Sequence, residues 1–187
     1  GVAEFIAPAF NIFGTVNSIG RLSLKLTSSN AAFSASGFVD VWLTTDLATS
    51  AAQVGSPLVY QAASQPDGVG TQLDPKFKVG TFFFDVSLGS NVAFVTDLKL
   101  DAATEAFIVN QINNGGVIRV IASNAGAGAG TFAGYSNTNV AGPILDLDAI
   151  VNGLTTVSGS VVFGDRPQNL PRFVDLVFRD PNDLGTV

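Results

Sequence analysis

The sequence contains no cysteine, no histidine and no methionine. Without cysteine there are neither disulfides nor thiolate sites. Without histidine the commonest general base and transition-metal ligand is missing, and the Ser-His-Asp and Cys-His mechanisms are impossible. The only glutamates are Glu4, in a predicted terminal strand, and Glu105, in a predicted helix, and no pair of carboxylates stands out for glycosidase chemistry. We therefore predict that the chain is not an enzyme.

Charge is also scarce. Only 13% of the residues are charged, the net charge is −6 and the isoelectric point is about 4.3. The nine basic residues are scattered singly, which argues against nucleic-acid partners and anionic membrane surfaces. No apolar run reaches the roughly 18 residues of a membrane span, so we expect no membrane insertion. A Ser-, Thr- and Gly-rich surface and a start at Gly1 favour a processed, secreted protein at the cell surface.

Alternation of apolar and polar residues dominates the chain. Residues 21–27 place three leucines on one face, which predicts a half-buried strand, and residues 38–44 do the same with Val39, Val41 and Leu43. The aromatic run 81–86 predicts a strand that is buried on both faces. Further strands are predicted at 93–95, 117–121 and 144–148, separated by turn-forming residues.

One segment, 101–115, is predicted to be helical. Asp101 is a good N-cap and Asn114-Gly115 a stop signal, and the buried stripe consists of Phe107, Ile108 and Ile112. A single short helix between strands suggests a lid on a sandwich. The run Ala125–Gly130 is either a loop or a close-packed strand crossing, and the loop is favoured because glycine weakens strands.

These elements predict an all-β fold: a jelly-roll β-sandwich over residues 1–150, with one short helix, and a C-terminal β-hairpin extension over 151–187. The extension contains two predicted strands, 156–164 and 172–179. Two strands cannot form an independent core. They must pack on the main body or complete a domain whose remainder lies elsewhere.

The stretch from about residue 92 to 149 resembles secreted bacterial jelly-roll domains, of the DNRLRE-type and PEP-CTERM-associated surface proteins. The resemblance is carried by Lys99–Asp101, Phe107–Asn114, Val117–Ser123, Thr131–Asn137 and Pro143–Leu147. The tail is similar to the opening of a transthyretin-like β-module, through Val157-Ser158-Gly159-Ser160-Val161 and Arg179-Asp180-Pro181. These resemblances imply a secreted surface protein.

Two kinds of ligand site are predicted. Carbohydrate contact needs displayed aromatic rings with amide partners, and the candidates are Trp42, Tyr60, Tyr135 and Asn137. Core packing or a hydrogen-bonded corner is the alternative role for the aromatic residues. A structural calcium would use oxygen ligands, and the candidates are Asp146, Asp148, Asp180, Asn182 and Asp183. An ordinary polar strand face and turn capping are the alternative for these residues.

The leading functional prediction is a non-catalytic extracellular structural protein, a filament subunit that assembles by β-strand donation. Low charge and the count of strands suggest that terminal segments add to a neighbour's sheet. The candidate donors are 1–10 and 156–187; the alternative is that both close their own sandwich. The other functional hypothesis is a carbohydrate-binding module of a secreted protein.

Overall fold

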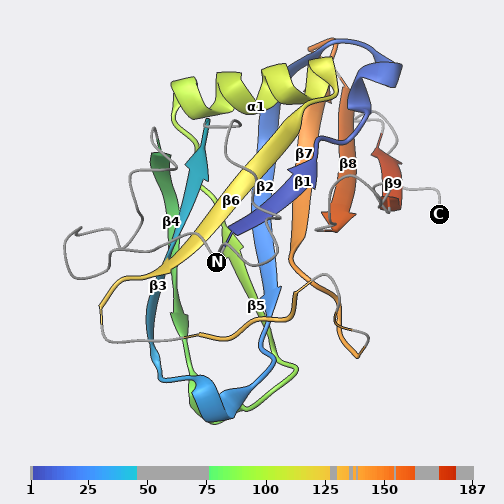
Figure 1. Cartoon of the computed structure of the whole chain (residues 1–187). Coiled ribbons are helices and arrows are strands. Elements are labelled where there is room, and N and C mark those ends of the chain that lie inside the picture. Colours follow the sequence, from blue (N-terminus) through green and yellow to red (C-terminus); the bar gives the residue numbers. More distant parts are fainter. Residues whose placement is uncertain are drawn as a thin grey trace.

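The computed structural model describes residues 2–45, 76–126, 130–134, 137, 139–153, 155–162 and 173–179. Two antiparallel sheets face each other, and a single helix lies across one end of the sandwich (Figure 1). The first sheet has the order β1-β6-β3-β4, and its strands are Val2–Ile6, Val117–Asn124, Gly37–Thr44 and Lys76–Phe84. The second sheet has the order β5-β2-β7-β8-β9, and its strands are Ala93–Asp97, Val16–Thr27, Ile144–Val151, Thr155–Val162 and Phe173–Arg179. The predicted all-β sandwich is confirmed.

The core forms because each strand sends alternate side chains between the sheets. Leu22, Leu24 and Leu26 of β2 are buried there, as the alternation predicts. The buried residues of β7 alternate along its whole length with half-buried ones. From the first sheet, β3 contributes Val41 and Leu43 to the same cluster. Both predicted half-buried strands are therefore confirmed.

The prediction that residues 81–86 are buried on both faces is wrong. Phe84 points into the core, but Phe83 is 51% exposed on the outer face, where its ring meets the ring of Phe38 edge-on. The strand ends at Phe84, and a 3-10 turn, η4 (Val86–Leu88), follows. The reason is that the outer face is exposed here, since Phe38, opposite Phe83 on the interior strand β3, is 55% exposed as well. The strand with both faces buried is β6, in which every residue from Val117 to Ile121 is buried.

The predicted helix is confirmed as α1, Ala102–Asn114. Asp101 caps its first turn by accepting a hydrogen bond from the Thr104 backbone N–H at 2.8 Å, and Gly115 ends it in the left-handed conformation. Ile108 and Ile112 are completely buried beneath the helix, and Phe107 packs against the same core from a half-buried position. The helix thus closes the end of the sandwich as a lid.

Two short 3-10 turns, η1 (Phe10–Phe13) and η2 (Ala31–Phe33), flank β2. After β7 the chain turns directly into β8, and the two strands pair from Ile144 opposite Val162 to Val151 opposite Thr155. β9 pairs with β8, so the predicted hairpin extends the second sheet. The jelly-roll connectivity and a domain boundary at residue 150 stay predictions. Of the run 125–130, residues 125, 126 and 130 lie outside any strand, and 127–129 lie outside the described residues.

Because α1 covers the end of the core, we expect its buried side chains to contribute to the free energy of unfolding. Ile112→Ala removes a side chain with 0% exposure and should lower the free energy of unfolding by about 2–5 kcal/mol. The matched control is Ile12→Ala, because Ile12 is 67% exposed in η1 and should change stability by no more than about 0.5 kcal/mol. Urea unfolding followed by circular dichroism measures both. Equal effects of the two substitutions would contradict the role of α1 as a lid.

Candidate functional site

Trp42 lies within a small polar network on the outer face of the first sheet. Its indole Nε1 donates a hydrogen bond to Ser123 Oγ at 3.0 Å, and the Lys78 ammonium lies 5.9 Å from its ring centroid. Lys78 Nζ also lies 2.6 Å from Asp40 Oδ1, and Thr81 Oγ1 donates to that same oxygen at 2.7 Å. These five residues are called the Trp42 cluster. They come from three neighbouring strands, β3, β4 and β6.

The cluster is largely satisfied by its own contacts. Asp40 is almost fully buried, and its charge is balanced by Lys78, as a buried carboxylate requires. The indole N–H already has an acceptor, and a cation lies over the ring, an arrangement that is itself attractive. Trp42 is half-buried, so only part of the ring is open to a ligand.

The other predicted carbohydrate residues are not joined to Trp42 by any described contact. Asn137 Oδ1 accepts hydrogen bonds from the backbone N–H groups of Asn139 and Val140, which caps its own turn. Tyr60 and Tyr135 lie outside the described residues. The carbohydrate assignment of these residues stays a prediction.

The predicted calcium ligands on β7 each have a partner of their own. Asp148 Oδ2 lies 3.1 Å from Arg21 Nε, and Asp146 accepts a hydrogen bond from Ser160 Oγ. The remaining candidates, Asp180, Asn182 and Asp183, lie outside the described residues. Within the described ranges, no group of three or more acidic residues is suitably arranged for a metal ion. The calcium site stays a prediction.

One buried hydroxyl near Asp146 has no partner. Ser23 on β2 stands opposite Asp146 of β7 on one side and opposite Asp97 of β5 on the other. Its Oγ is buried and makes no hydrogen bond in the described part of the chain. A hydroxyl in this state lowers stability rather than raising it.

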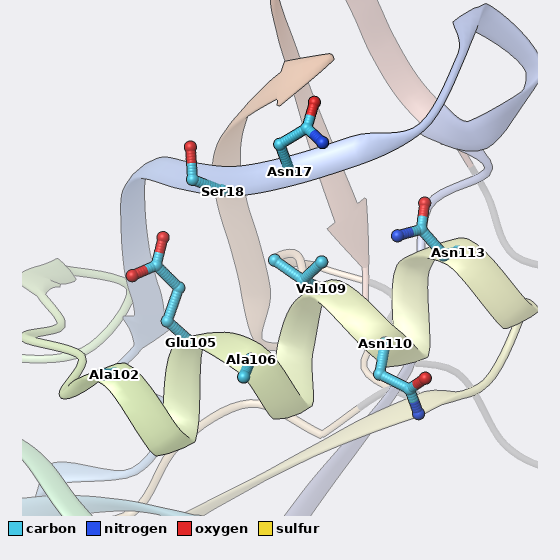
Figure 2. Close-up of a pocket in the computed structure, with 8 residues that line it drawn as sticks. All are labelled: Asn17, Ser18, Ala102, Glu105, Ala106, Val109, Asn110 and Asn113. Carbon is cyan, nitrogen blue, oxygen red and sulfur yellow. The ribbon is translucent and has the colours of Figure 1, made fainter. Parts of the chain in front are cut away.

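A groove of about 420 Å³ runs between α1 and the first half of β2 (Figure 2). The helix supplies small and amide side chains together with one carboxylate, and the strand supplies an amide and a hydroxyl. The lining residues are Asn17, Ser18, Ala102, Glu105, Ala106, Val109, Asn110 and Asn113. The sequence analysis did not single out this site.

Side chains of α1 hold the first half of β2 in place of a neighbouring strand. β5 pairs with β2 only from Ser23 to Thr27, so none of the described strands lies beside the first half of that edge. There Asn113 accepts from the Val16 N–H at 3.0 Å and donates to the Val16 carbonyl at 2.9 Å. Glu105 Oε1 accepts from the Ile19 N–H at 2.8 Å. Figure 2 shows Glu105 and Asn113 pointing from the helix toward the strand.

Two irregularities in β2 shape the groove wall. Relative to β7, β2 has one extra residue between Val16 and Ser18, and another between Ile19 and Arg21. Val16 and Ile19 both pack against the core, so the two residues between them, Asn17 and Ser18, lie on the other side of the strand. Bulges of this kind re-aim side chains beside functional sites.

The N-cap of α1 next to the groove is a titratable residue, Asp101. The hydrogen bond from the Thr104 backbone N–H holds the pKa of Asp101 below its ordinary value of 3.8. A carboxyl with a lowered folded-state pKa stabilises the fold above its ordinary pKa, and this contribution is lost as the pH falls through the lowered value. The cap is therefore intact at neutral pH.

Comparisons with family models, curated proteins and solved structures found no match to this chain. The resemblance to secreted jelly-roll and transthyretin-like modules therefore stays a prediction. In the described ranges, no helix is both long enough and apolar enough to cross a bilayer.

A sequence signal for the groove does exist. Val16 and Ile19 are three residues apart, which breaks the alternation that continues from Arg21 onward. Such a break is typical of a bulge. What the sequence does not provide is the partner across the groove, because α1 lies more than 80 residues further along the chain.

Two neighbouring asparagines test how much the hydrogen bonds between Asn113 and the Val16 backbone stabilise the fold. Asn113→Ala leaves the N–H and C=O of the buried Val16 without their partner and should lower the free energy of unfolding by about 1–3 kcal/mol. Asn114→Ala is the control, because Asn114 is exposed and bonds only within the helix, so its effect should stay within about 0.5 kcal/mol. Chemical unfolding measures both. If Asn113→Ala and Asn114→Ala had the same free energy of unfolding, the hydrogen bonds of Asn113 to Val16 would not stabilise the fold.

Proposed function

We propose that the chain is a non-catalytic extracellular structural protein whose copies associate by exchanging the segment 1–10, here called the donor segment. The low content of charged residues and the absence of histidine and cysteine support this proposal over a catalytic role. The main observation in its favour is that the donor segment pairs with β6 at the edge of the sheet and buries Phe5 in the core.

The donor segment fills the core from the edge of a sheet. β1 is an edge strand, and among the described strands it forms a ladder only with β6. It nevertheless buries Phe5 completely, and the segment also places Ala3, Ala7 and Phe10 in the core. If the segment left, a gap beside β6 would remain that fits the same segment of an identical chain. Donation of a strand into such a gap relies on main-chain hydrogen bonds for affinity and on side-chain pockets for specificity.

The second candidate donor, 156–187, is a poorer choice on the same criteria. β8 forms one ladder with β7 and a second with β9, so it lies inside its sheet. Val157 and Val161 of β8 are also buried in the core. Releasing the segment 156–187 would break the ladder with β7 that runs from Thr156 to Val162, which is longer than the ladder of β1 from Val2 to Ile6. A head-to-tail exchange of the donor segment produces an open filament if the rotation between subunits does not close.

Cysteine pairing tests the exchange directly, because the chain has no cysteine of its own. Ile6 stands opposite Val117, and the Ala7 N–H donates to the Gly116 carbonyl. The pair 6/117 therefore lies between the hydrogen-bonded pairs, where Cα atoms are about 4.5 Å apart, close enough for a disulfide. In an Ile6→Cys/Val117→Cys variant, exchange links different chains and produces a ladder of oligomers on a non-reducing gel.

The single variant Ile6→Cys is the control and should form no ladder beyond chance dimers. Native material viewed by negative-stain electron microscopy should contain fibres. A double variant whose disulfide forms only within each chain, together with a monodisperse monomer at all concentrations, would refute strand donation.

The alternative function is a carbohydrate-binding module that uses the Trp42 cluster. A half-buried tryptophan beside a carboxylate and an ammonium group is the feature that favours it. On a glycan array, Trp42→Ala should then abolish binding, whereas Phe38→Ala, at an exposed ring elsewhere on β3, should retain it. Unchanged binding by Trp42→Ala would rule out this cluster as the contact surface.

A further inference from the structure

We propose that the groove between α1 and β2 binds a neutral, hydroxyl-rich ligand no larger than a disaccharide. This site is separate from the Trp42 cluster, which lies on β3, β4 and β6. The proposal is independent of strand donation, because neither the donor segment nor β6 lines the groove.

The groove has the size and the floor that such a ligand needs. Its volume of about 420 Å³ falls within the range of roughly 300–1,000 Å³ that is typical of small-molecule sites. Ala102, Ala106 and Val109 provide a floor of small apolar side chains, on which the C–H face of a sugar ring can lie.

Four polar groups around this floor have no protein partner in the described part of the chain. Glu105 uses Oε1 to hold Ile19, which leaves Oε2, and Asn110 Oδ1 accepts from Asn114, which leaves the Asn110 Nδ2 protons. The amide of Asn17 and the hydroxyl of Ser18 complete the set, because both residues line the groove between Val16 and Ile19, which pack against the core.

The mixture of donors and acceptors selects the class of ligand. Asn110 Nδ2 can only donate, Glu105 Oε2 can only accept, and Asn17 and Ser18 can do both. Sugar hydroxyls also donate and accept, so they match all four groups. An ammonium group only donates and would leave Asn110 unmatched. An anion is disfavoured because the lining contains one carboxylate and no lysine or arginine.

Saturation-transfer difference NMR tests the proposal, since it observes the ligand and works on single chains and on filaments alike. The probes are glucose, mannose, N-acetylglucosamine and cellobiose, with glucuronate as the anionic comparison. At least one neutral sugar should show saturation transfer and bind more tightly than glucuronate. Asn110→Ala should weaken its binding about three- to tenfold, the effect of one lost hydrogen bond.

Two tryptophan substitutions on the same helix locate the ligand. Ala106→Trp fills the groove and should abolish saturation transfer, whereas Ala103→Trp, at an exposed position of α1 outside the lining, should retain it. Trp42→Ala should also retain it. Circular dichroism checks that each variant is folded. No transfer to any neutral sugar would overturn the proposal, and so would binding that survives Ala106→Trp or disappears with Trp42→Ala.

Discussion

Two sheets share one apolar core, and the strands send alternate side chains into it. Among the described strands, the edge strand β1 fills the part of the core beside β6. Phe5 occupies that place with no exposed surface. Removing a buried aromatic side chain lowers stability, and in the proposed assembly the same side chain of an identical chain takes its place. The proposed assembly depends on this property of β1.

At the end of the sandwich, α1 covers both the core and an edge of β2. Its apolar face covers the core through Ile108 and Ile112, while Glu105 and Asn113 supply the hydrogen bonds that a further strand would have given to β2. An uncovered strand edge is a template for unwanted pairing, so a helix that covers it also limits aggregation. The groove is the space left between these two anchor points, eight residues and about 12 Å apart along the helix.

Much of the fold could be predicted from local patterns. The alternation in β2 and β3 and the cap and stop signals of α1 are local, and the structure confirms them. Phe83 shows the limit, because an aromatic run does not reveal which face of its strand is exposed. The break between Val16 and Ile19 indicates a bulge, but the partners across the groove and around Trp42 could not be predicted from local patterns. Asp40 meets Lys78, and Ile19 meets Glu105, only through strand order and helix placement.

In the proposed assembly, β1 lies beside β6 of a neighbouring chain. Phe5 and Ile118 are opposite each other in that ladder. Solid-state NMR on assemblies formed from an equal mixture of ¹³C-labelled and ¹⁵N-labelled chains measures whether this contact joins different molecules. Strand donation predicts cross-peaks between Phe5 carbons of one chain and the Ile118 amide nitrogen of another. Correlations between these two residues that arise only within uniformly double-labelled chains, and never in the mixture, would contradict it.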